Sequence, residues 1–156
     1  MTPPSATPRA VVDTNLLVSG VILARGNPHA LLAAWREGDF HLIFSTKQYV
    51  ELVDVLSRPK LVERYGLEVD ELAALFDGLS AIPRIESIPP LPLMVRDPKD
   101  EFLLATALAA DATHLVSGDN DLLVLRGDPR LGALQIITVI EFLAVLARRG
   151  QQDRPE

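Results

Sequence analysis

The sequence predicts an α/β domain built on a parallel sheet that is covered on both faces. Apolar segments of strand length alternate along the chain with longer segments that have helical spacing. The strand-like segments are short and almost wholly apolar, which is typical of parallel sheets buried on both sides. The chain has 156 residues, of which 48% are hydrophobic, enough for one domain with a sizeable core. We expect the domain over residues 9–149, with flexible tails over 1–8 and 150–156.

The first part of the chain predicts two strands and the helices that connect them. The expected elements are a strand over 9–13, a helix over 16–23, a helix over 28–35 and a strand over 41–44. A further helix should begin after Ser45, because Ser45 and Gln48 have the spacing of a capping box. Apolar residues then recur at helical spacing until Pro59, which closes or kinks that helix.

The second part continues the alternation of helices and strands. The expected elements are helices over 59–65 and 69–79, a strand over 82–85, an extended connector over 88–93, a helix over 98–110, a strand over 114–117, a turn over 118–121, a strand over 135–139 and a helix over 140–149. The connector is expected because proline disfavours helix at the preceding residue. Asp97 followed by Pro98 is a typical helix start.

Composition excludes several classes of function. The chain has no cysteine, so it has no disulfide, thiolate metal site or cysteine nucleophile. No segment is typical of a signal peptide, and no apolar run approaches the roughly 20 residues that span a bilayer. We therefore expect a soluble, cytoplasmic protein with no membrane partner. The net charge of −6 argues against a broad basic surface for nucleic acid. It is compatible with an enzyme whose carboxylates bind a cation that contacts phosphate.

Four acidic residues interrupt apolar or helix-capping segments, and Asp121 is a fifth candidate; the four are Asp13, Glu51, Asp100 and Asp119. Asp13 and Asp119 follow the carboxyl ends of two expected strands, where ligands bind in parallel α/β sheets. Each acid alone also has a structural explanation. Asp13 can cap a helix, Glu51 can be a solvated helical residue, Asp100 suits a first helical turn, and Asp119 suits a turn.

Taken together, these acids predict a metal site. Like charges about 4 Å apart repel by several kcal/mol at intermediate dielectric, and a divalent cation removes that repulsion. Oxygen ligands favour Mg²⁺ or Mn²⁺, and the chain has no cysteine and no pair of histidines spaced for zinc. The chemistry that this predicts is metal-assisted hydrolysis of a phosphodiester.

Three segments, in this order, resemble a known family: "VVDTNLLVSG", "YVELVDVL" and "RDPKDEFLLATALAADATHLVSGDNDLL". They are similar to PIN domains, in particular the VapC-like toxins of type II toxin–antitoxin pairs. The resemblance implies a three-layer α/β/α sandwich and an endoribonuclease that depends on Mg²⁺ or Mn²⁺ and leaves a 5′-phosphate. It also implies three partners, namely RNA, a small antitoxin protein and a second copy of the chain in a homodimer.

The resemblance assigns roles by motif. Asp13, Glu51, Asp100 and Asp119 match the catalytic, metal-binding acids, while Thr14, Asn15, Ser117 and Asp121 match the residues that support them. Serine at position 117 is a mild departure, because many members have threonine there. The motif around Glu51 is short, so Asp54 and Glu63 are its competitors if the helix has another register.

Two other hypotheses about the function stay open at this point. A phosphoaspartyl hydrolase also uses an aspartate at a strand end with Mg²⁺, but it usually has a second aspartate two residues later, where this chain has Asn15. A catalytically silent PIN fold that only binds RNA or protein is the other alternative. The presence of all four acids argues against it.

Overall fold

The structure is a computed structural model that describes residues 6–86, 88–91 and 95–152, and the strands within these ranges form one parallel sheet. The strands are β1 (Arg9–Val12), β2 (His41–Ser45), β3 (Arg84–Ile85), β4 (His114–Val116) and β5 (Gln135–Ile137). Their order in the sheet is β3-β2-β1-β4-β5, and all four pairings are parallel. The first strand in the sequence is therefore the central one, which places its carboxyl end between those of β2 and β4.

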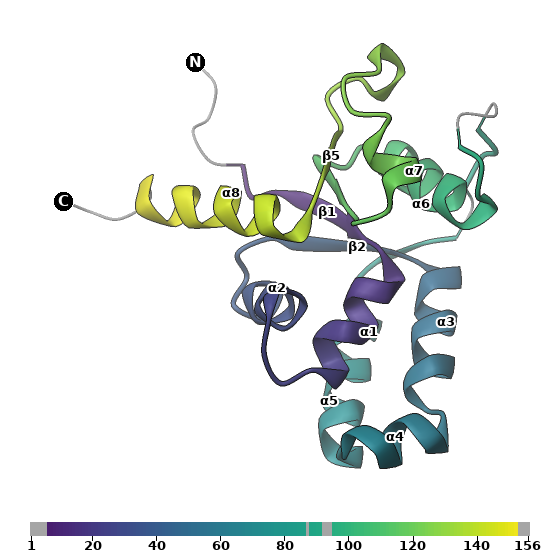
Figure 1. Cartoon of the computed structure of the whole chain (residues 1–156), viewed down its shortest axis with the longest axis vertical. Helices are drawn as coiled ribbons and strands as arrows, with labels where there is room; N and C mark the ends of the chain where they lie inside the picture. The colour runs from purple at the N-terminus through teal and green to yellow at the C-terminus, as the bar shows by residue number, and fades with distance from the viewer. Residues whose placement is uncertain (1–5, 87, 92–94, 153–156) are drawn as a thin grey trace.

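Helices lie on both sides of this sheet (Figure 1). Those of the described ranges are α1 (Thr14–Ile22), α2 (Asn27–Arg36), α3 (Thr46–Leu56), α4 (Pro59–Tyr65), α5 (Val69–Ser80), α6 (Pro98–Ala109), α7 (Asn120–Leu123) and α8 (Val139–Gln152), with a short 3₁₀ helix over Pro129–Leu131. In Figure 1, α1, α2 and α3 are drawn below the strands, and α6 and α7 above them.

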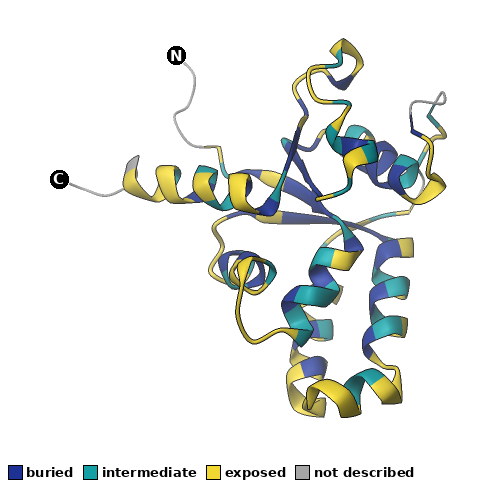
Figure 2. Cartoon of the chain, in the orientation of Figure 1, coloured by how far each residue is buried: buried dark blue, intermediate teal, exposed yellow. Residues whose placement is uncertain are grey.

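Two hydrophobic cores, one on each face of the sheet, confirm the three-layer α/β/α arrangement. Side chains alternate along each strand, so Ala10 and Val12 of β1 face one core and Val11 faces the other. The first core receives α1, α2, α3, α5 and α8 through buried residues such as Leu52 and Phe142. The second receives α6 and α7. Figure 2 shows the strands buried between exposed outer helix faces.

The structure differs from the sequence-based expectations at several element ends. Residues 120–123 form the short helix α7 where a turn was expected, because the Asp119 carboxylate accepts a hydrogen bond from the Asp121 amide at 2.9 Å and caps a helix. Helix α8 continues to Gln152, beyond its expected end at residue 149. The expected strands over 9–13, 82–85, 114–117 and 135–139 are shorter as observed. The expected connector over 88–93 lies partly outside the described residues.

No single helix within the described ranges is both long and apolar enough to cross a membrane. By length and composition alone, α1 and α2 pass as a pair, and that pair is bent by 93°.

Candidate metal centre

The candidate centre starts where β1 and β4 end side by side. Val12 and Val116 are register partners, and the Asp13 amide donates a hydrogen bond to the Val116 carbonyl at 3.0 Å. The Ser117 hydroxyl, fully buried, donates to Asp13 Oδ2 at 3.0 Å and accepts from the Asp119 amide at 3.1 Å. Ser117 therefore connects the two acids that follow these strands.

Asp13 is held by its own helix as well as by Ser117. It is the N-cap of α1, and its Oδ1 accepts a hydrogen bond from the Asn15 amide at 3.0 Å. Both carboxylate oxygens of Asp13 are thus hydrogen-bonded. Asp13 therefore caps a helix and also lies beside the other acids.

Asp100 is the most unusual acid of the centre. It lies in the first turn of α6 and is only 4% exposed, and its Oδ2 has no hydrogen-bond partner in the described part of the chain. Burial raises its pKa from 3.8 to about 7, and a hydrogen bond with Asp119 and the charges of Asp119, Asp97 and Asp13 act in the same direction. A buried carboxylate with a free oxygen is costly unless something else compensates it.

One carboxylate oxygen each from Asp100, Asp119 and Asp121 lie within 4.8 Å of one another. Among the described residues, this is the group of acids with the spacing to hold one ion, and Asp13 and Glu51 are not in it. The resemblance had placed Asp13 and Glu51 with the metal ligands and Asp121 with the supporting residues. Asp121 also follows directly after the N-cap of α7, where its amide donates a hydrogen bond to the Asp119 carboxylate.

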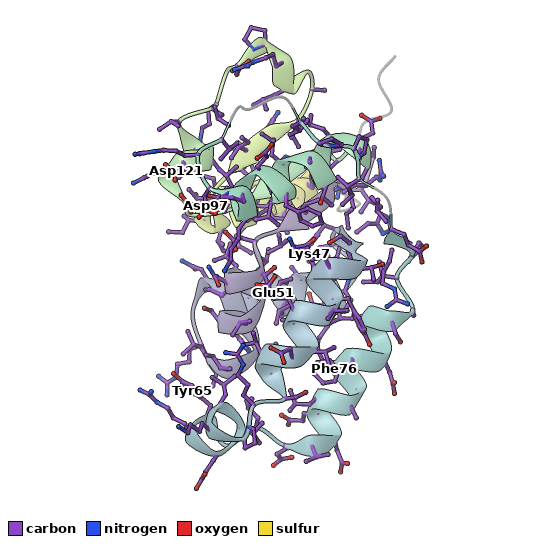
Figure 3. All side chains as sticks on the ribbon, turned by 90° about the vertical axis from the view of Figure 1, so that its right-hand side faces the viewer. Lys47, Glu51, Tyr65, Phe76, Asp97 and Asp121 are labelled. Carbon is purple, nitrogen blue, oxygen red and sulfur yellow. The ribbon has the colours of Figure 1, made fainter. Side chains whose placement is uncertain are left out.

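A cavity of about 100 Å³ opens beside this group. Its lining residues are Asp13, Thr14, Asn15, Lys47, Gln48, Glu51, Asp97, Lys99, Asp100, Phe102, Leu103 and Asp119. Figure 3 shows Glu51 and Lys47 on α3, below Asp97 at the start of α6. The cavity thus receives residues from both helical layers at the carboxyl edge of the sheet.

The register of α3 distinguishes Glu51 from its two competitors. Glu51 lines the cavity, whereas the described lining residues include neither Asp54 nor Glu63. Asp54 is exposed and forms an ion pair at 3.0 Å with Arg58, which lies just beyond the end of α3. Glu63 is exposed on α4.

Gln48 links α3 to the end of β1. The sequence predicts only its part in the capping box, not this contact. The capping box with Ser45 is present as predicted. In addition, Gln48 Nε2 donates to the Val12 carbonyl at 3.0 Å and to Thr14 Oγ1 at 3.5 Å, and the residue is 2% exposed. Because Glu51 follows Gln48 by three residues on the same helix, this contact fixes Glu51 relative to Asp13. No sequence signal points to a contact across 36 positions.

Five further lining residues were not selected from the sequence for the site: Lys47, Asp97, Lys99, Phe102 and Leu103. Asp97 caps α6 as expected, accepting from the Lys99 amide at 2.9 Å, and also faces the cavity. The Lys47 ammonium lies 4.5 Å from the centroid of the Phe102 ring. Helix spacing alone could not show that α3 and α6 meet here.

A comparison with models of known protein families matches residues 9–121 to the PIN domain family. The chain belongs to the PIN domain family. Every residue that lines the cavity, as well as Ser117 and Asp121, falls within the matched range. PIN domains are generally nucleases that use divalent metals, and membership suggests RNA binding. No curated protein and no solved structure matches the chain.

The residues present fit a divalent metal ion. The donor groups of the PIN domain centre are carboxylate oxygens, which hard cations prefer. The buried Asp100 Oδ2 lacks a partner, and a cation would supply one while removing the repulsion among the three acids. No histidine is among the described residues that line the cavity, so the donor set is not that of a typical zinc site.

Proposed function

We propose that this PIN domain is an endoribonuclease that hydrolyses RNA phosphodiester bonds with Mg²⁺ or Mn²⁺. The observation that carries the proposal is Asp100, a buried acid with an unpartnered oxygen beside Asp119 and Asp121, in a cavity shared with Asp13 and Glu51. A protein that used these acids only for structure would satisfy the buried oxygen with a donor of its own.

In this proposal Asp100 and Asp119 hold the metal ion together with the nearby Asp121, and Asp13 and Glu51 complete the acidic site from the wall of the same cavity. A divalent ion bound there supplies two functions, lowering the pKa of water and neutralising charge on the phosphate. The chain's own residues set the geometry. The Ser117 hydroxyl and the Asn15 amide orient the Asp13 carboxylate, and Gln48 holds the first turn of α3, three residues before Glu51.

The raised pKa of Asp100 makes metal affinity depend on pH. Below a pH of about 7 the Asp100 carboxyl is largely protonated in the metal-free protein, so an ion must displace that proton. Affinity should therefore rise with pH through this region and level off above it. A carboxylate pocket with ordinary pKa values would reach its plateau near pH 5.

The decisive experiment is cleavage of a labelled RNA by purified protein with Mn²⁺, Mg²⁺ or excess EDTA. Asp100→Asn and Asp119→Asn should each lower the metal-dependent rate by about 100-fold or more, because each removes a charged ligand. Glu51→Gln should also lower it, while Asp54→Asn, on the same helix but outside the cavity, should not. Wild-type rates in Asp100→Asn and Asp13→Asn would contradict the assignment. A phosphoryl adduct trapped on Asp13 would favour the phosphoaspartyl alternative.

We further propose that the protein is the toxin of a type II toxin–antitoxin pair, as the resemblance of its motifs implies. Induced expression should arrest growth and degrade RNA, and Asp13→Asn should abolish both effects at equal protein level. A small antitoxin encoded beside the gene should co-purify with the chain and relieve the arrest. Light scattering tests the proposed homodimer. Unchanged growth and intact RNA on expression of the wild type would refute the toxin role and leave the nuclease proposal to the assay with purified protein.

A further inference from the structure

Phe102 is placed differently from the other phenylalanines of the chain. The sequence has five, of which Phe40, Phe44 and Phe142 are buried in the core and Phe76 packs against it. Phe102 is half-buried, lines the acidic cavity and is not among the residues that pack against either core. An aromatic ring that lines a polar cavity instead of packing in the core can contact a ligand.

The position of Phe102 relative to the buried Asp100 is fixed by the helix that carries both. Phe102 follows Asp100 by two residues in the first turns of α6, so the ring and the buried carboxylate belong to one rigid element. Residues two apart on a helix point in different directions, which allows one to reach the metal group and the other the cavity wall. A base lying on Phe102 would belong to a nucleotide beside the scissile phosphate.

Lys47 approaches the same ring from α3, with its ammonium 4.5 Å from the ring centroid. The chain has three lysines, and two of them, Lys47 and Lys99, line this cavity. The cavity lining includes no arginine among the described residues, although the chain has more arginines than lysines. Lys47 is exposed, and no ion pair joins it to a carboxylate within the described ranges.

The charges of the cavity make it unfavourable for RNA unless groups such as Lys47 and Phe102 hold the strand. Five of the lining residues are acids, and the whole chain carries a net charge of −6, so the surroundings repel the phosphates that flank the scissile bond. A metal ion neutralises only the phosphate it contacts. The face of an aromatic ring attracts a cation in the absence of ligand, and it stacks equally on any nucleobase.

We propose that Lys47 and Phe102 form a substrate-positioning pair beside the metal centre. A nucleobase stacks on Phe102, and the Lys47 ammonium moves from the ring face to a neighbouring phosphate. The pair holds RNA in the cavity and does not take part in bond cleavage. This inference rests on the proposed ribonuclease function, because it assigns the ring and the ammonium to the same RNA.

The test compares variants that keep or remove one property at a time. Phe102→Leu removes the π face and keeps an apolar side chain, while Phe102→Trp keeps the π face. Lys47→Met removes the charge and keeps the stem. Lys60→Met is the matched control, because Lys60 is the third lysine, exposed on α4 and outside the cavity. Phe76→Leu is the control for a half-buried phenylalanine away from the cavity, as Figure 3 shows.

Phe102→Leu should raise KM about tenfold and leave kcat within about twofold, since stacking binds ground and transition states alike. Phe102→Trp should retain the wild-type KM. Lys47→Met should raise KM and lower the slope of log Kd against log salt by about 0.7, the value for one phosphate contact on a single strand. Lys60→Met and Phe76→Leu should change neither. Thermal unfolding confirms that each variant is folded.

Binding is measured separately with a fluorescent RNA of about 12 nucleotides and Ca²⁺ in place of Mn²⁺. Single bases are removed one position at a time. Removal at one position should weaken binding to the wild type and have no effect on Phe102→Leu, because the partner of that base is already missing. Equal KM, Kd and base dependence in wild type and Phe102→Leu would overturn the inference while cleavage itself persists. Loss of metal-dependent cleavage in the wild type would instead overturn the nuclease function, and the binding series would still decide the role of the ring.

Discussion

Replacing Asp100 by asparagine should stabilise the metal-free protein while abolishing the proposed nuclease activity. The Asp100 side chain is 4% exposed, and its pKa is raised from 3.8 to about 7 by burial and by Asp119, Asp97 and Asp13. The folded state therefore binds this proton more tightly than the unfolded state. Stability is greatest below the unfolded pKa and is lost as the pH rises from about 4 through about 7.

The size of the effect follows from the shift. A rise from 3.8 to about 7 corresponds to roughly 4 kcal/mol of unfolding free energy lost once Asp100 is ionised. Asparagine does not ionise, so Asp100→Asn should unfold about 10 °C higher than the wild type at pH 8 in EDTA. At pH 4 the two proteins should unfold at similar temperatures, because the wild-type carboxyl is then largely neutral.

Thermal unfolding at pH 4 and pH 8, with EDTA and with Mn²⁺, measures this directly. At a hundred times its Kd, Mn²⁺ should raise the free energy of unfolding of the wild type by about 3 kcal/mol, and with it the unfolding temperature. It should have little effect on Asp100→Asn. An Asp100→Asn protein less stable than the wild type at pH 8 in EDTA would refute the reasoning. It would show that the ionised carboxylate already has a compensating partner in the absence of metal.

Three further predictions concern residues that shape the centre or the helices under it, and a glycine near the end of α8 serves as a control. Ser117→Ala should weaken Mn²⁺ binding, measured by calorimetry, about tenfold, since the carboxylates lose a shared hydroxyl. Gln48→Leu should lower the free energy of unfolding in urea by about 1–3 kcal/mol, because a buried carbonyl of β1 loses its donor. Gly20→Ala should lower it by a similar amount, since a Cβ there would lie 2.6 Å from the carbonyl oxygen of Pro28. Gly150→Ala, which meets nothing within 4 Å in a helix, should be neutral or slightly stabilising.

The features that the sequence predicted correctly are those set by neighbours along the chain. Helix starts were predicted because the N-cap side chains of Ser45 and Asp97 bond to amides two or three residues later. The parallel sheet was predicted because both faces of its strands are apolar. The meeting of Asp13 and Asp119 at one edge followed from strand direction alone.

The features that were missed depend on contacts between distant segments. The bond from Gln48 to the β1 carbonyl and the approach of Lys47 to Phe102 require the relative placement of α3 with the β1–α1 junction and with α6. Local patterns carry no information on that placement. The approach of an Asp121 oxygen to oxygens of Asp100 and Asp119 likewise depends on how α6 lies relative to the start of α7.

Because β1 lies between β2 and β4, the candidate metal centre cannot exist in a half-folded chain. The hydrogen bond from Ser117 to Asp13 joins residues 104 positions apart, and α6 must also dock before Asp100 reaches its place. Such long-range pairings form late, since loop closure opposes them until the sheet is nearly complete. A nascent fragment that ends before β4 has neither Ser117 nor Asp119. The group of acids that could bind a metal ion is therefore complete only once the whole sheet has folded.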